Sequence, residues 1–230
     1  MRRFADRQQA GRELATMLHA FADRSDVVVV ALPRGGVPVA FEVAAALHAP
    51  LDVFTVRKVG LPDNDEYAVG AVATGGIVSI DRHLIDWFRI SEHVLNGLIE
   101  RARTELVRRE RLYRGHRAPL HLRGRTVIVV DDGLATGATM QTAVIALRSL
   151  DPARIVVATP IASHQAETAV TEVADVVVCA CVPSDLQSVG QWYGDFVQVT
   201  DEEVVQLLHR ATLVAHPAHR DLDDAGAWYA

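Results

Sequence analysis

Fourteen consecutive residues, Val127 to Met140, bring together side chains that few chemistries require side by side. They read VIVVDDGLATGATM: four apolar β-formers, two adjacent carboxylates, and a turn of small residues that opens an amphipathic segment. The four apolar residues do not alternate with polar ones, which is typical of a strand buried on both faces of a parallel sheet. Asp131 and Asp132 therefore fall at the carboxyl end of that strand, where open α/β sheets bind ligands.

The turn that follows the two carboxylates has the composition of an anion site. Residues 133–139 carry little side-chain bulk, so successive backbone N–H groups can close on an anion at the start of the next helix. Thr136 and Thr139 add hydroxyl donors. A turn that only capped the helix would need one side-chain oxygen, and this stretch supplies several. The sequence thus predicts a bound phosphate, with carboxylates beside it for sugar hydroxyls or a metal.

These fourteen residues resemble the phosphoribosyl-pyrophosphate (PRPP) motif of the type I phosphoribosyltransferases. The resemblance implies that Asp131 and Asp132 accept hydrogen bonds from the ribose 2′- and 3′-hydroxyls. It also implies that the 5′-phosphate is bound by Ala135, Thr136, Gly137, Ala138 and Thr139. Hypoxanthine-guanine members of the family carry an aspartate near the purine at the position of Ala135, whereas adenine-type members carry alanine. Ala135 therefore counts against a 6-oxopurine acceptor.

A second group of candidate residues follows another predicted strand, Val27 to Ala31. The segment Pro33-Arg34-Gly35-Gly36 breaks this strand, so we expect it at the same sheet edge as the motif. A cation next to two glycines allows backbone amides to approach a polyanion closely. By resemblance, Arg34, Gly35 and Gly36 form the pyrophosphate loop of the family, in which a strained or cis peptide is common.

Arg57 and Lys58 form a third group, at the end of the next predicted strand, Leu51 to Val56. They resemble the Arg-Lys pair with which orotate and adenine transferases bind pyrophosphate. The string RKVGLP is close to the adenine-type pattern, although it lacks that pattern's second lysine. The resemblance therefore implies that these two cations bind pyrophosphate, and it favours adenine as the acceptor.

The segment beyond these cations is predicted to be a flap. Val59 to Glu66 is loop by composition, and residues 67–80 read as a hairpin around Gly75-Gly76. By resemblance, Val59 to Gly76 would be a mobile segment that closes over PRPP and excludes water. Glu66 is either a catalytic acid or the exposed start of the hairpin, and the sequence leaves this open.

Strands and helices alternate along most of the chain, which predicts an α/β fold with a central, mostly parallel sheet flanked by helices. Further strands are expected at 154–159 and 176–180, and helices at 4–21, 37–48, 91–114, 165–173 and 201–212. We expect one domain over residues 1–213 and a disordered tail at 214–230. The resemblance implies the type I phosphoribosyltransferase fold with a small hood over about 181–200. Its aromatics, Trp192, Tyr193 and Phe196, favour packing over ligand contact.

Composition excludes several other classes of protein. The chain has 230 residues, half of them hydrophobic, and a net charge of −6, which argues against nucleic-acid binding. It lacks eighteen consecutive apolar residues and a signal peptide, so we expect a cytoplasmic protein without membrane contact. Cys179 and Cys181 lie two apart in an apolar run, a spacing that favours reduced core residues over zinc or a disulfide. A homo-oligomer is compatible with the sequence.

Together these features predict a phosphoribosyltransferase that moves ribosyl 5-phosphate from PRPP to a nitrogen acceptor, a nucleobase or related molecule, and releases pyrophosphate. The resemblance implies Mg²⁺, held mainly by PRPP and reached by Asp131 or Asp132 through hydroxyls or water. The alternative is a regulatory protein that senses PRPP or a nucleotide with little or no catalysis. A dinucleotide-binding Rossmann protein is excluded because no GxGxxG follows the first strand.

Overall fold

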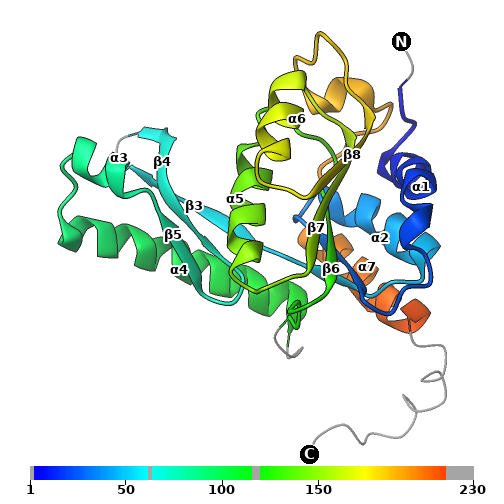
Figure 1. Ribbon diagram of the computed structural model, residues 1–230, viewed down its shortest axis with the longest axis horizontal. Helices are drawn as coiled ribbons and strands as arrows, with labels where there is room; N and C mark the ends of the chain where they lie inside the picture. The colour runs from blue at the N-terminus through cyan, green and yellow to red at the C-terminus, as the bar shows by residue number, and fades with distance from the viewer. Residues whose placement is uncertain (1–2, 62–63, 116–119, 216–230) are drawn as a thin grey trace, which may run out of the picture.

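The computed structural model describes residues 3–61, 64–115 and 120–215, and its centre is a five-stranded sheet (Figure 1). The strands stand in the order β2-β1-β6-β7-β8, and every neighbouring pair is parallel. Their bounds are β1 Val27–Ala31, β2 Leu51–Val53, β6 Thr126–Val130, β7 Arg154–Ile161 and β8 Val176–Cys181. The predicted α/β architecture with a parallel central sheet is confirmed.

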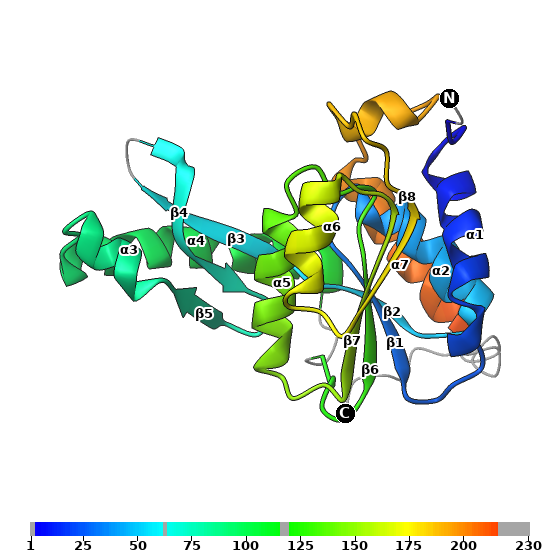
Figure 2. The same cartoon turned by 45° about the horizontal axis from the view of Figure 1, so that its top comes forward.

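Helices cover both faces of this sheet (Figure 2). One face carries α1 Arg7–Met17, α2 Gly36–Leu47 and α7 Asp201–Ala215, and the other carries α5 Ala138–Arg148 and α6 His164–Thr171. Alternate residues of the central strands enter the two cores: Val29 packs with the first group of helices and Val30 with the second. Both are fully buried, which explains why these strands show no polar alternation.

Most predicted elements are present with small shifts at their ends. The amino-terminal helix starts at Arg7 because Asp6 caps it, its carboxylate accepting from the backbone N–H of Gln9 at 2.7 Å. A short 3-10 turn, His19–Phe21, completes the predicted segment. The last helix continues to Ala215, two residues into the predicted tail, and residues 216–230 lie outside the described part of the chain.

Residues 56–114 form a separate substructure, here called the arm, that projects from the sheet (Figure 1). It contains the antiparallel strands β3 Val56–Leu61, β4 Asn64–Ala73 and β5 Ile77–Ile80, followed by α3 Arg82–Trp87 and α4 Glu92–Arg114. Many of its apolar side chains make their own cluster, which includes Val59, Val72, Leu95 and Leu106. The interpretation of Val59 to Glu66 as loop is wrong, because Val59–Leu61 and Asn64–Glu66 lie in paired strands.

The segment after β8 runs over the carboxyl edge of the sheet, where a hood was expected. It contains one short 3-10 helix, η2 Val189–Trp192. The chain's amino-terminal residues join it: Phe4 N donates to Trp192 O at 2.9 Å, and Gly194 N donates to Phe4 O at 2.8 Å. Trp192 and Tyr193 are buried against Phe4, so the amino-terminal residues pack together with the segment that follows β8. None of the described helices is long and apolar enough to span a membrane.

Candidate functional site

The motif turn joins β6 to α5 at the carboxyl edge of the sheet. Leu134 is tied to β7 by its N–H, which donates to Ile161 O at 2.9 Å, and Ser163 Oγ donates to Ala135 O at 2.6 Å. Gly137, in the left-handed region at φ 76°, ends the turn and begins α5. The start of the turn is thus fixed by hydrogen bonds to Ile161 and Ser163, and its end continues directly into α5.

The predicted phosphate-binding residues are arranged at this turn as follows. Ala135, Thr136 and Thr139 are exposed, Ala138 is half-buried and Gly137 is buried. The exposed hydroxyls stand beside the first turn of α5, whose initial N–H groups have no partner within the helix. This arrangement of hydroxyls and helix N–H groups can bind an anion.

Asp131 and Asp132 directly follow β6 and differ in their surroundings. Asp131 Oδ1 accepts from the backbone N–H of Asp132 at 2.9 Å. Burial, and secondarily the adjacent Asp132 charge, raises the pKa of Asp131 well above its ordinary value. Burial also raises the pKa of Asp132, an effect that a hydrogen bond from Arg7 opposes. Two carboxylates held together at low exposure are costly for the fold, which is typical of residues kept for binding.

The predicted pyrophosphate loop lies against these carboxylates. Its Pro33–Arg34 peptide bond is cis, as is common in the resembling family. A Cβ on Gly36 would stand 2.7 Å from Val130 O and 2.9 Å from Asp131 Cα. A Cβ on Gly35 would strike the side chain of Asp132. The structure therefore brings Gly35 and Gly36 together with both carboxylates, at a separation that only glycine allows.

Arg34 points toward the start of α7. Its Nη1 lies 3.8 Å from Asp201 Oδ1, and both side chains are about one-third exposed. The same carboxylate oxygen accepts from the hydroxyl of Tyr113, at the end of α4, at 2.5 Å. Burial and this carboxylate raise the pKa of Tyr113 to about 12. Arg34 is therefore linked through Asp201 to the root of the arm.

Arg57 and Lys58 do not end a strand of the parallel sheet, and that part of the prediction is wrong. The second sheet strand stops at Val53, and both cations lie within β3, opposite Val72 and Ala71 of β4. Arg57 is half-buried and Lys58 is exposed. The strand predicted over Leu51 to Val56 divides between β2 and β3, because β4 offers β3 an antiparallel partner that the local sequence does not reveal.

Sequence reasoning missed Arg7, whose side chain is only 10% exposed. Its Nε donates to Asp132 Oδ2 at 2.8 Å, and its Nη1 donates to Val197 O at 2.8 Å. The guanidinium carbon stands 3.9 Å from the ring centroid of Phe196. Tyr193 adds a hydrogen bond from its hydroxyl to Asp132 O at 2.6 Å. The only sequence signal was an arginine in the first turn of a helix, which carries no information about such a distant partner.

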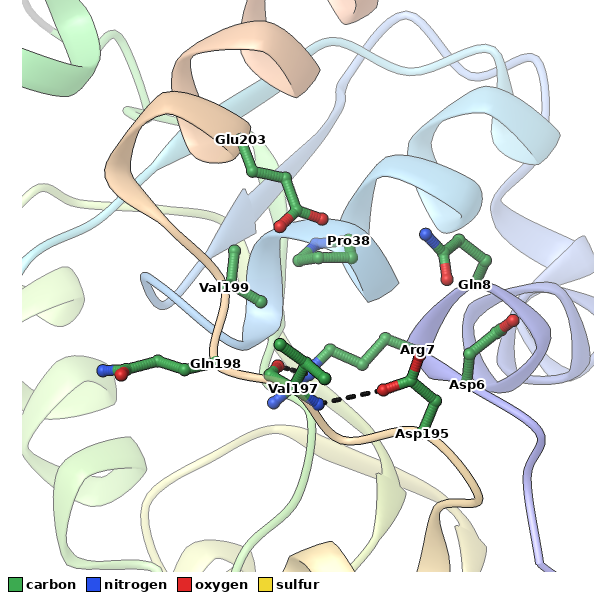
Figure 3. A pocket seen from close by; sticks show the side chains of 9 residues that line it. All are labelled: Asp6, Arg7, Gln8, Pro38, Asp195, Val197, Gln198, Val199 and Glu203. Atoms are coloured by element: carbon green, nitrogen blue, oxygen red, sulfur yellow. Dashed lines mark hydrogen bonds between the residues drawn. The ribbon is translucent and has the colours of Figure 1, made fainter.

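A pocket with a volume of about 200 Å³ opens beside Arg7 (Figure 3). It lies between the starts of α1, α2 and α7 and the last residues of the hood segment, 195–199. Its lining is Asp6, Arg7, Gln8, Pro38, Asp195, Val197, Gln198, Val199 and Glu203. None of the predicted site residues is among them, so the pocket flanks the carboxylate pair rather than covering the motif turn.

The remaining sequence candidates have simpler surroundings. Cys179 and Cys181 are free and half-buried in β8, and burial raises the pKa of the Cys179 thiol to about 11. This pKa keeps Cys179 protonated near neutrality, in agreement with a packing role. Among the described residues, no group of three or more His, Cys, Asp or Glu side chains is arranged to hold a metal ion.

Two proteins of Mycobacterium tuberculosis, strains CDC 1551 and H37Rv, are each 40% identical to this chain over 227 residues. Both are provisionally named phosphoribosyl transferases, MT0597 and Rv0571c. The match covers 99% of this chain but 49% of each relative, so the chain spans about half their length.

Among solved structures, TT1426 from Thermus thermophilus is similar with a TM-score of 0.80 and 42% identity. That similarity covers 91% of this chain and 99% of TT1426. The sequence family described as phosphoribosyl transferase domain matches residues 4–195, a range that contains the Arg34-Gly35-Gly36 segment, the motif turn and most of the hood segment. The chain therefore belongs to the phosphoribosyltransferase family, and its fold is that of the type I members.

Proposed function

We propose that this chain binds PRPP at the carboxyl edge of its parallel sheet and transfers the ribosyl 5-phosphate group to a nitrogen acceptor. The observation that carries the proposal is the adjacency of the Asp131–Asp132 pair to an exposed hydroxyl-bearing turn and to the close-packed Gly35-Gly36 segment. Carboxylates would accept from the ribose hydroxyls, the turn would bind the 5′-phosphate, and the glycine segment would bind pyrophosphate.

Cleavage of the anomeric C–O bond places positive charge on the ribose and negative charge on the departing pyrophosphate. The side chains suited to the leaving group are Arg34 and, on the arm, Arg57 and Lys58, together with backbone N–H groups of the glycine segment. The acceptor nitrogen attacks the anomeric carbon, and the bond to pyrophosphate oxygen breaks with its electron pair. No covalent intermediate with the protein is required.

The carboxylates also fit a magnesium ion of the kind that the family implies. Mg²⁺ prefers oxygen ligands, and it usually keeps several waters and binds substrate phosphates. One or two protein carboxylates are therefore enough, although no group of three or more possible ligands is found among the described residues. Asp131 and Asp132 would hold the ion indirectly, through ribose hydroxyls or water. When bound, Mg²⁺ would offset charge on the pyrophosphate.

The acceptor we propose is a nucleobase or related nitrogen compound, with adenine the first to test. Ala135 lacks the carboxylate expected beside a 6-oxopurine, so hypoxanthine and guanine should be poor acceptors. The test is acceptor-dependent pyrophosphate release at saturating PRPP and Mg²⁺, with bases, amines and water compared. Release above the hydrolytic background with one acceptor supports the proposal. Tight PRPP binding without any turnover would instead favour a PRPP-sensing regulator.

We also propose that residues 59–76 close over bound PRPP. In the described part of this segment β3 pairs with β4, and residues 62–63 lie outside it. The strand pair is continuous with Arg57 and Lys58, so contact between these cations and pyrophosphate would draw it toward the sheet edge. Hydrogen exchange with and without PRPP is the test, and equal protection in both states would contradict closure. Whether Glu66 takes part is tested by comparing turnover of Glu66→Gln with the wild type.

A further inference from the structure

Arg7 makes three kinds of contact with a side chain that is only 10% exposed. It bonds one of the two motif carboxylates, a backbone carbonyl of the hood segment, and the face of an aromatic ring. These contacts bring together three distant parts of the chain: the end of β6, the segment after η2, and α1. Arg7 is therefore the point at which the amino-terminal helix, the hood and the carboxylate pair meet.

We propose that Arg7 is a positioning residue for PRPP, which holds the Asp132 carboxylate in one orientation and ties that orientation to the position of the hood. This inference rests on the proposed function. Asp132 Oδ2 accepts from Arg7, and this bond fixes the orientation in which the carboxylate offers its remaining lone pairs to a ribose hydroxyl. Because the guanidinium is planar, its bonds to Asp132 and Val197 fix the carboxylate relative to the hood backbone.

Charge supports the same assignment. The groups that interact with the Asp132 carboxylate include Asp131, Arg7 and the hydroxyl of Tyr193. Arg7 is the cation of this group, and it faces two adjacent carboxylates. If Arg7 were absent, Asp131 and Asp132 would face a polyanionic ligand without the positive charge of its guanidinium. The guanidinium thus lowers the repulsion that PRPP meets as it approaches Asp132.

The pocket beside Arg7 shows why this link can respond to the hood. Arg7 and Val197 both line the pocket, and Val197 O is the hood acceptor of the guanidinium (Figure 3). The pocket leaves open space beside this contact, and Arg7 also bonds Asp132, which is not among the lining residues. A displacement of residues 195–199 would therefore move Arg7 and, through it, Asp132.

A double-mutant cycle between Arg7 and Asp132 tests the inference, with PRPP affinity measured by calorimetry in the presence of Mg²⁺. The variants are Arg7→Met, Asp132→Asn and their combination. Arg7→Met should weaken PRPP binding roughly tenfold when Asp132 is present. In the Asp132→Asn background the same change should have less than about a threefold effect, because its partner is already absent. Arg7→Lys, which keeps the charge but not the planar contacts, should fall between Arg7→Met and the wild type.

The matched control is Arg12→Met on the same helix. Arg12 is 59% exposed and lies 3.6 Å from Glu42, away from the carboxylate pair, so its loss should leave PRPP affinity unchanged. If Arg7→Met does not fold, Arg7→Gln carries the same cycle. Equal losses in both backgrounds, or tighter binding by Arg7→Met, would overturn the positioning role. A wild-type protein that does not bind PRPP would overturn the proposed function, and this inference with it.

Discussion

The five-stranded sheet and the arm are built from opposite strand patterns. The sheet strands β1 and β6 are buried on both faces, and each proposed ligand group except Arg57 and Lys58 lies just beyond a carboxyl end of one of them. The arm strands are antiparallel and contribute to an apolar cluster of the arm's own, distinct from the two cores of the sheet. The comparison shows a sheet region that carries the carboxylates and the motif turn, and an arm joined to it at one end.

The polar contacts that join the two regions lie at the root of the arm. Thr55 N donates to Thr74 Oγ1 and Thr74 N donates to Thr55 O, both at 2.9 Å, so the residue just before the arm is paired with the β4–β5 turn. Arg114 is paired with Asp52 at 3.1 Å, and Tyr113 bonds Asp201 beside Arg34. Of these contacts, the bond from Tyr113 to Asp201 connects the root of the arm to Arg34 of the predicted pyrophosphate loop.

The largest expected effect falls on the sheet region. Replacing Asp131 and Asp132 by Asn should remove charge-assisted hydrogen bonds to ribose hydroxyls, at roughly 1.5–3 kcal/mol of PRPP binding energy for each carboxylate. Calorimetry of the two single variants and the double variant measures this. Glu100→Gln on the exposed face of the arm is the control, with unchanged affinity expected. Undiminished binding in the double variant would remove the carboxylates from the site.

The Asp131 substitution should also alter how the stability of the ligand-free protein depends on pH. Burial raises the pKa of Asp131, so the folded state holds this proton more tightly than the unfolded chain does. Folding stability is therefore gained as pH falls through the raised pKa, and it is lost as pH rises through it. We expect Asp131→Asn to be more stable than the wild type near neutrality, with a difference that shrinks toward acidic pH. Thermal melts of both proteins across pH measure this difference.

The next effect tests whether the arm folds as a separate unit. Leu106 is 1% exposed in the arm's cluster, so Leu106→Ala should cost about 2–5 kcal/mol. Because this cluster is distinct from those of the sheet, we expect faster hydrogen exchange in the arm and unchanged exchange in β6 and β7. Ile128→Ala in the central strand is the matched variant and should open the whole molecule. A uniform loss of protection with Leu106→Ala would show that arm and sheet form one cooperative unit.

A smaller effect is expected at the joint between the two regions. Tyr113→Phe removes the hydrogen bond to Asp201 and should cost roughly 1 kcal/mol of stability. It should also weaken PRPP binding a few-fold, because Asp201 then holds Arg34 less firmly. Denaturant unfolding and calorimetry measure the two quantities. A loss of stability with unchanged PRPP affinity would show that the arm's root does not influence the pyrophosphate loop.

The smallest effect is expected at the end of the arm. Trp87 is 80% exposed, so Trp87→Ala should change stability by no more than about 0.5 kcal/mol and leave PRPP binding intact. Trp192, 7% exposed in the hood, is the contrasting position, and Trp192→Ala should destabilise the protein by about 3–5 kcal/mol. If Trp87→Ala and Trp192→Ala lowered the stability by similar amounts, Trp87 would have to be buried against another surface in solution.

Sequence reasoning succeeded where the signal was local. The run VIVVDDGLATGAT predicted β6, the turn and α5 because strand burial, acidic residues and small residues follow one another directly. It failed where partners are distant along the chain. The division of residues 51–61 between two sheets depends on β4, and the role of Arg7 depends on residues more than a hundred positions away. Pairing of this kind is decided by tertiary packing, which a single sequence does not encode in its local pattern.

Gly35 and Gly36 of the predicted pyrophosphate loop differ in whether a second substitution could make a larger residue acceptable at that position. The three atoms nearest to a Cβ at position 35 all belong to the side chain of Asp132, so a smaller residue at 132 would remove these clashes. A side chain at position 36 would meet the backbone of Val130 and Asp131, which every residue type retains. A larger residue at position 35 thus requires an earlier substitution of Asp132 by a smaller residue. At position 36 no substitution elsewhere removes the clash, because the end of β6 itself would have to move.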